Sequence, residues 1–306
     1  MDKLERNDWY MNTLSMEYAV DMKRIDNFFE TSISNYINDL NYAYLVTETK
    51  HDDDEFRMLY IEAEGQLIGK LKKTFEAIIQ AIKSCIEKIR NAANTEAQKM
   101  KLKRIAKKIS SKNIKYIRKE YANGHVTKDA KRDAIQSTQA DYKKYIVLIN
   151  RVCGLAKEIN KAKPGDDLSE YEKQLDECIR VFKLSITGCN IALKLNVNEN
   201  VNSIVKDVKV LDETLLKISE ESKKRIEEIE KYATEGNSEN TSPEKIRLMK
   251  RCATSIGIIS KTTSQSMVTS VNKRIDVLDK AIDDAIANGV ESGLKQKTDD
   301  INDDED

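Results

Sequence analysis

Residues that interrupt regular structure are scarce in this sequence. Among 306 residues there are two prolines and ten glycines, whereas 40% of the residues are hydrophobic and 34% are charged. Few turn formers and many charges are typical of long helices with a solvated face, and they argue against a turn-rich β architecture. We therefore expect an all-α fold, an elongated bundle of about seven long amphipathic helices with coiled-coil-like pairing.

Long uncharged runs are also missing. The longest strongly apolar stretches, such as YIVLI at Tyr145–Ile149, are far shorter than the ~20 residues of a membrane-spanning helix. The N-terminal residues MDKLERNDWYMN contain no apolar segment of the kind found in secretory signals. We therefore expect no transmembrane segment and synthesis in the cytoplasm.

The residues that mark an enzyme or a metal centre are few. The two histidines, His51 and His125, have no partner at metal-ligand spacing, and there is no glycine-rich phosphate loop. The acidic run HDDDE at 51–55 lacks the alternating ligands and central glycine of a calcium loop, so an acidic helix start is the simpler interpretation. We expect no catalytic, cofactor-binding or metal-binding residue, no cofactor and no enzymatic activity.

Cysteines are odd in number and form no CxxC pair, which argues against a zinc site or a thiol-exchange motif. All of them lie within helical patterns, which predicts buried thiols in a reducing compartment. They are Cys85, Cys153, Cys178, Cys189 and Cys252.

An excess of one charge is absent, since the formal net charge is zero. Two segments are nevertheless asymmetric: nearly every charge in Lys99–Lys119 is positive, and the last residues, TDDINDDED, are almost wholly negative. The simpler interpretation is a solvated helix face and an acidic disordered tail at 299–306. The alternative is weak, non-specific polyanion binding through Lys99–Lys119, for which the tail competes within the chain.

What the sequence does contain is helical periodicity, most clearly in its first third. Apolar and aromatic residues between Leu14 and Tyr44 recur at spacings of 4, 4 and 3, and this eleven-residue repeat favours nearly straight helix pairing. That helix is expected to end near TKHDDDE. After Gly65, the segment Leu67–Ile89 places its large apolar residues on one face and its lysines largely off it. We expect burial of this face against other helices at Ile78, Ile79 and Ile82.

Three further helices are predicted from periodicity and end signals. The basic helix is expected to end at ANGH, residues 122–125, and the next to run from Thr127 to Pro164-Gly165 with Tyr142 and Ile146 on its apolar face. Ser169 and Glu172 have capping-box spacing at the start of the third.

A heptad seam follows the Asn-rich segment NVNENVN. It begins at Val201 and includes polar members at Ser222 and Arg225. The clearest linker comes next, at 233–242, with Ser242 as N-cap and Pro243 at the first helical position. We therefore expect a helical bundle at 1–232 and a long C-terminal helix at 243–298 that packs on it.

The middle of the last helix, SKTTSQSMVTS, is rich in serine and threonine. Such a polar stretch packs weakly, which predicts a thin helix–helix contact. The alternative is a docking surface for a partner.

One part of the chain resembles a known class of proteins. The element EAEG at Glu62–Gly65, followed by LIGKLKKTFEAIIQAIKSCIEKI, is similar over about thirty residues, Glu62–Asn91, to the opening of helical virion structural proteins of large tailed bacteriophages. The resemblance implies a virion location and synthesis in the host cytoplasm, and it identifies no functional residue. Where such phages use a head-maturation protease that cuts after glutamate, Glu64 is the analogous position, although the surrounding residues do not fit a strict cleavage pattern.

Three functions are compatible with the sequence. We expect a non-catalytic structural or assembly protein, a virion component that binds other virion proteins or itself through helix–helix contacts. The alternative is a membrane-active amphipathic helical protein that inserts Leu67–Ile89. Nucleic-acid association through the basic helix is less favoured, because that helix is mostly lysine and has few aromatic residues.

Overall fold

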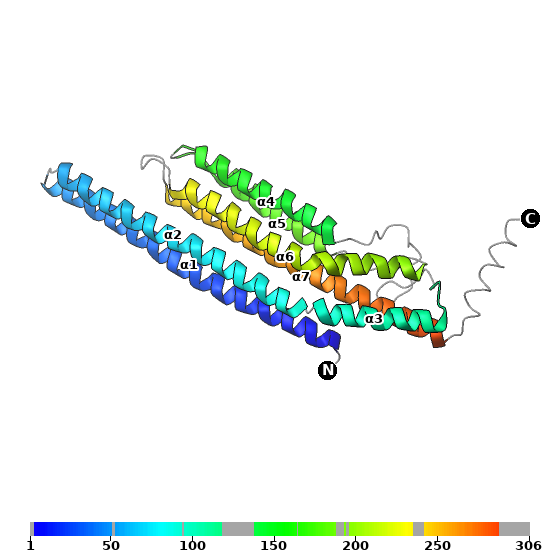
Figure 1. Cartoon of the computed structure of the whole chain (residues 1–306). Helices are drawn as coiled ribbons and strands as arrows, with labels where there is room; N and C mark the ends of the chain where they lie inside the picture. Colours follow the sequence, from blue (N-terminus) through cyan, green and yellow to red (C-terminus); the bar gives the residue numbers. More distant parts are fainter. Residues whose placement is uncertain are drawn as a thin grey trace, which may run out of the picture. The chain divides into compact units, whose positions relative to one another are not determined.

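The described part of the chain is all-α. A computed structural model describes residues 3–50, 53–93, 95–117, 138–163, 165–187, 193, 196–234 and 242–287. Within them the only β pairing is an isolated bridge between Tyr116 and Asn196. The predicted fold class is therefore confirmed for these residues. The helices are α1 (Lys3–Lys50), α2 (Asp53–Ala93), α3 (Thr95–Lys112), α4 (Thr138–Lys161), α5 (Ser169–Thr187), α6 (Val197–Thr234) and α7 (Pro243–Ala287) (Figure 1).

The chain forms two compact units, each assembled from separate segments. Unit 1 comprises Met1–Ile89, Lys144–Lys183 and Lys217–Thr262. Unit 2 comprises Arg90–Lys143, Leu184–Leu216 and Thr263–Asp306. Each unit thus contains residues from both sides of the predicted linker at 233–242. Helices α2, α4, α5, α6 and α7 contribute residues to both units.

In unit 1, α1 and α2 form a long antiparallel hairpin (Figure 1). The eleven-residue repeat of α1 is buried from Leu14 through Tyr36, with Ile25 half-buried. At its end the prediction is wrong, because Ala43 is buried and Tyr44 is 59% exposed. The step from Leu40 to the next core position is thus three residues and not four, so the core departs from the eleven-residue period after Leu40.

Helix α2 begins earlier than predicted and runs through Gly65 without a break. A helix tolerates isolated glycines at about 1 kcal/mol each when apolar packing on either side holds it. The expected burial of its apolar face is confirmed, since Ile78, Ile79 and Ile82 are 0%, 6% and 1% exposed.

In unit 2, α3 ends at Lys112, so the predicted end at ANGH is wrong. Asn113 has a φ of 52°, and the N–H of Ile114 donates to the carbonyl oxygen of Ile109 at 3.1 Å. This is the hydrogen bond of a Schellman cap, with asparagine in the left-handed position that glycine usually occupies. Residues 118–137, which include the predicted stop at Gly124 and the predicted helix start at Thr127, lie outside the described residues.

Helix α6 begins at Val197 and not at Val201, because the Asn-rich segment supplies its cap. The side-chain oxygen of Asn196 accepts hydrogen bonds from the backbone N–H groups of Asn198 at 2.9 Å and Glu199 at 3.3 Å. Asparagine is among the most favourable N-cap residues, so the segment predicted to separate two helices starts one of them.

The apolar face of α4 and the cap of α5 differ from the sequence prediction. In α4, Tyr145 is completely buried, whereas Tyr142 and Ile146 are only half-buried. In α5 the capping box is wrong, because the N–H of Glu172 donates to the backbone oxygen of Leu168. Ser169 instead donates through both its N–H and its hydroxyl to the carboxylate of Asp167.

Helix α7 starts where predicted and is the most enclosed helix. The N–H of Lys245 donates to the hydroxyl oxygen of Ser242 at 3.2 Å, which confirms the N-cap. Every residue from Lys245 to Asp279 is buried or half-buried. Of the neighbouring predicted segments, 235–241, 288–298 and the acidic tail at 299–306 lie beyond what the structure describes.

Close approach of three helices in unit 1 depends on Gly257 of α7. A Cβ added there would overlap the hydroxyl of Tyr18 in α1 and lie 2.9 Å from Cδ1 of Ile82 in α2. Gly154 of α4 has no atom within 4 Å of the corresponding position. The two helical glycines thus differ in surroundings, which makes them a matched pair.

We predict opposite effects of alanine at these glycines. Gly257→Ala should lower the free energy of unfolding by about 1–3 kcal/mol, because overpacking outweighs the gain in helix propensity. Gly154→Ala should raise it by up to about 1 kcal/mol, because only the propensity changes. Urea unfolding followed by circular dichroism measures both, and equal effects of the two substitutions would contradict the packing of α7 against α1 and α2.

Candidate interaction surfaces

The Ser/Thr-rich middle of α7 is part of the core. Ser260, Thr263 and Ser264 are at most 4% exposed, so the alternative of a docking surface is wrong for these residues. In unit 1 the hydroxyls of Ser222 and Ser260 lie 2.7 Å apart, and that of Ser222 lies 2.9 Å from the hydroxyl of Tyr145. Tyr145 also donates to the backbone oxygen of Ile218 at 3.1 Å. Ser260 therefore makes a hydrogen-bonded contact with α4 and α6, whereas the hydroxyl oxygens of Thr263 and Ser264 are buried without a hydrogen-bond partner among the described residues.

Unit 2 has an ion pair in its core. The guanidinium of Arg274 in α7 binds the carboxylate of Asp207 in α6, and it donates to the hydroxyl of Ser203 at 2.9 Å. Asp207 also accepts a hydrogen bond from the backbone N–H of Thr138 at 3.3 Å, at the start of α4. Both charged side chains are almost fully buried. Such a pair fixes the alignment of its helices, because each buried charge needs its partner.

Neither Arg274 nor Asp207 was among the residues predicted from the sequence. Their signal is that each charge interrupts an apolar stripe: Arg274 lies between Val271 and Leu278, and Asp207 between Ile204 and Leu211. A charged residue at a core position of a helix requires a buried partner.

Two buried lysines of α7 bind other helices within unit 1. The ammonium of Lys245 donates to the backbone oxygens of Asn160 at 3.0 Å and Ala162 at 2.9 Å, where the C-terminal end of α4 leaves carbonyls unpaired. Burial lowers the pKa of Lys245 below its usual value. Lys250 pairs with Asp26 of α1. Both ammonium groups are therefore bound to groups of the same unit.

We predict that the buried pair of unit 2 behaves non-additively. Arg274→Met should lower the free energy of unfolding by about 3–5 kcal/mol, because Asp207 is left buried without a cation. Adding Asp207→Leu should recover part of that loss. Lys280→Met, at an exposed position of the same helix, should change stability by less than about 0.5 kcal/mol. A double substitution that costs the sum of the two single substitutions would contradict the coupling.

The basic run Lys99–Lys119 is divided by the fold of unit 2. Lys108 of α3 binds Asp279 at 2.9 Å and Asp283 at 2.7 Å, and Lys101 binds Asp276. Hydrogen bonds from Lys108 to Asp283 and Asp279 raise the pKa of its ammonium. One side of α3 is therefore paired with the acidic side of α7.

The other side of α3 is a candidate polyanion surface. Its basic side chains are exposed and make no ion pair with a described residue. They are Lys103, Arg104 and Lys107; the exposed Lys112 and Lys115 lie at and beyond the end of α3. Arg118, Lys119 and the acidic tail are not among the described residues, so competition between tail and surface stays a prediction.

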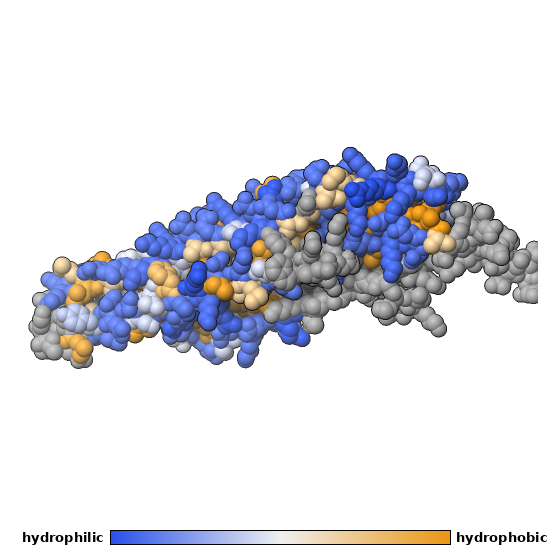
Figure 2. All heavy atoms as spheres, turned by 90° about the horizontal axis from the view of Figure 1, so that it is seen from below, coloured by the Kyte–Doolittle hydropathy of each residue, from blue (hydrophilic) through white to orange (hydrophobic). Residues whose placement is uncertain are grey.

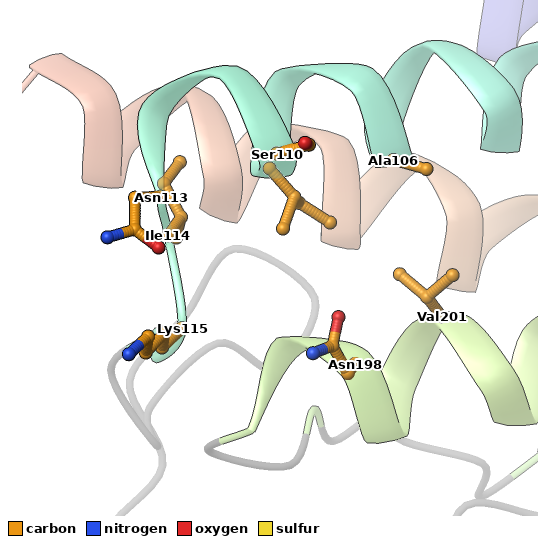
Figure 3. A pocket seen from close by; sticks show the side chains of 8 residues that line it. Ala106, Ser110, Asn113, Ile114, Lys115, Asn198 and Val201 are labelled. Atoms are coloured by element: carbon orange, nitrogen blue, oxygen red, sulfur yellow. The ribbon is translucent and has the colours of Figure 1, made fainter.

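An open cavity of about 330 Å³ lies in unit 2 between the end of α3 and the first turns of α6 (Figure 3). Apolar side chains including Ile109 and Val201 line one part of it, and Asn113, Lys115 and Asn198 line another. The N–H of Val197 donates to the backbone oxygen of Lys115 at 3.2 Å beside it. The lining contains one charged side chain and no acid–base or nucleophilic pair, so we assign no ligand to it.

The cysteines are a further set of residues whose surroundings were predicted. Four cysteines, Cys85, Cys153, Cys178 and Cys252, are buried and free, as predicted, and Cys189 is outside the described residues. Burial raises the pKa of Cys85 to about 11 and that of Cys252 to about 12, so these thiols are poor nucleophiles at neutral pH.

Neither histidine lies in the described part of the chain. Its residues contain no group of three or more His, Cys, Asp or Glu side chains placed to hold a metal ion. A search of its helices for a segment of sufficient length and hydropathy to cross a membrane found none.

Comparison with protein-family models, curated proteins and solved structures found no match to this chain. Inferences about its function therefore depend on its own residues.

We predict that neutralising the two sides of α3 has different effects. The combined change Lys103→Gln, Arg104→Gln and Lys107→Gln should weaken binding to a DNA duplex in low salt and reduce the salt dependence of that binding, with thermal stability unchanged. Lys101→Gln with Lys108→Gln should mainly lower stability, by up to about 1 kcal/mol for each pair. Fluorescence anisotropy and thermal melts distinguish them, and equal weakening by the two sets would contradict the division.

Proposed function

We propose that this protein is a non-catalytic structural or assembly protein, a component of a bacteriophage particle that binds other virion proteins through its helices. The main supporting observation is the tip of the α1–α2 hairpin in unit 1. Five large side chains from both helices are 58–73% exposed there. They are Tyr42, Tyr44, Leu45, Met58 and Ile61. An exposed group of apolar residues at the end of a helical hairpin is typical of a protein–protein contact.

The surface elsewhere is consistent with this proposal. Figure 2 shows mostly hydrophilic residues with separate apolar patches on the face that it views, including patches at the end where the α1–α2 hairpin closes. The resemblance of Glu62–Asn91 to helical virion proteins supports the location in a particle.

Processing at Glu64 is a separate question. The residue is half-buried and lies inside continuous helix in α2. Proteolysis favours exposed loops, so cleavage there would require local unwinding of α2. The intact mass of the protein from particles measures this directly.

The membrane-active alternative receives less support. The apolar face that it would insert, including Phe75, Ile78 and Ile82, is buried within unit 1. Burial of each such side chain is worth about 1.5–3 kcal/mol. Inserting the face into lipid would require unit 1 to open and would remove these side chains from its core.

We predict that the protein is found in purified particles by mass spectrometry and remains after washing with high salt. Leu45→Asp with Ile61→Asp should reduce its incorporation severalfold without lowering its thermal midpoint, because both side chains are exposed. Val147→Asp, an exposed apolar position of α4, serves as the control.

Dye-filled liposomes test the alternative. No release is expected from the folded protein. Release that Ile82→Lys abolishes while the thermal midpoint is kept would overturn the assembly proposal in favour of membrane activity.

A further inference from the structure

Helix α1 has a second regular strip on the side opposite its core. Its members are exposed and recur at spacings of 4, 4 and 3, the same eleven-residue repeat as the buried face. We call these ten residues the α1 strip. They are Asn12, Met16, Val20, Lys23, Asn27, Thr31, Ser34, Asn38, Tyr42 and Leu45.

The α1 strip is almost uncharged. Lys23 is its only charged member, although 34% of the residues of the chain are charged. Solvated helix faces are usually rich in charge, so this composition requires another explanation. A nucleic acid or another highly charged partner would gain little from such a surface, whereas a neutral helix face could pack on it.

The order of residues along the strip is symmetric about Thr31. From Met16 to Leu45, large apolar residues occupy both ends, with Met16 and Val20 before the centre and Tyr42 and Leu45 after it, whereas Asn12 has no counterpart. Lys23 and small polar residues lie between them. When two copies of this helix pack antiparallel around a two-fold axis at Thr31, each position meets its mirror position in the other copy.

This pairing places apolar residues against apolar residues and keeps the two Lys23 side chains apart. Met16 lies beside Leu45 of the second copy, and Val20 beside Tyr42 of the second copy. Lys23 lies beside Asn38 of the second copy, an uncharged acceptor. A parallel pairing would place Lys23 against Lys23, and like charges at such positions destabilise a helix pair.

The charge nearest the axis is already compensated. Glu30 flanks the α1 strip beside Thr31, so two copies would bring two of these carboxylates close together. The guanidinium of Arg247 lies 3.2 Å from the carboxylate of Glu30 within the same chain. The pair reduces the repulsion between copies.

We propose that a second copy of this chain binds the α1 strip, antiparallel and two-fold symmetric about Thr31. The contact extends over about 50 Å of helix, from the rise of ~1.5 Å per residue. With four large apolar side chains from each copy, the dimer is weak and its population depends on concentration. The proposal deepens the assembly function and rests on it for its biological role.

A charge-swap experiment on the full chain tests the geometry. Val20→Lys and Tyr42→Glu should each weaken dimerisation at least tenfold in sedimentation equilibrium, because each places a charge against an apolar side chain. The two together should restore most of it, because the introduced lysine then faces the introduced glutamate of the second copy. Both positions are exposed, and unchanged thermal midpoints verify the fold.

Two controls make the result specific. Ser84→Lys, at an exposed position of α2, should leave the dissociation constant unchanged. Thr31→Cys should form a disulfide between copies under mild oxidation much faster than Ser84→Cys, because only residue 31 meets itself at the axis.

The outcomes are distinguishable from those of the assembly proposal. A wild-type chain that stays monomeric at millimolar concentration overturns the dimer even when the protein is found in particles. Loss of dimer in both single variants without recovery in the double variant overturns the antiparallel arrangement. A dimer with the expected recovery supports the α1 strip even when the protein is absent from particles, which overturns only the assembly proposal.

Discussion

The enclosure of α7 is the constraint on which the rest of the structure depends. Its residues from Lys245 to Asp279 are buried or half-buried, although the sequence of the helix is rich in lysine, arginine, serine and threonine. An unpaired polar group in a protein core costs about 1–3 kcal/mol. The helices around α7 must therefore place hydrogen-bond acceptors and donors opposite its polar side chains. A shift of α7 along its own axis would break several of these contacts together.

The two units meet this requirement with different chemistry. In unit 1, Ser260 uses hydroxyl groups of α4 and α6, and Lys250 uses the carboxylate of Asp26 in α1. In unit 2, Arg274 uses Asp207 and Ser203 of α6. Neutral hydroxyls also donate to their own helix, as Ser260 does to the backbone oxygen of Ile256. They therefore tolerate the loss of a partner better than a buried ion pair does, because each member of the pair would lose its counter-charge.

Periodicity predicted the parts of the fold that depend on one helix alone. Ile82 was recognisable as a core residue because its neighbours three and four positions away are apolar, and Phe29 because Ile25 and Ile33, four positions away, are apolar. The end of α3 was missed because Asn113 adopts a conformation that glycine favours more strongly, and Gly124 was the more obvious signal. Tyr145 was missed because Tyr142 fits a helical face equally well, and only the packing of other helices decides between them.

The role of polar residues could not be predicted, because their partners are distant in sequence. Ser260 contacts Tyr145 across 115 positions, and Lys108 contacts Asp279 across 171. A basic run is the same in sequence whether its charges meet water or a neighbouring helix. Only the fold separates Lys108, which is paired, from Lys107, which is exposed. Once such internal pairs are identified, the charges that remain unpaired on the surface indicate where a partner could bind.

The eleven-residue period of α1 connects its packing to its use. A helix with this period stays nearly straight, so a strip on either side keeps its direction over the whole length. A heptad helix would wind its outer face around the partner that covers its inner one. The buried face of α1 packs in unit 1. The α1 strip, on the opposite side, can therefore meet a second straight helix along its full length. The same repeat that specifies the core thus also specifies an almost uncharged surface suited to another copy of the chain.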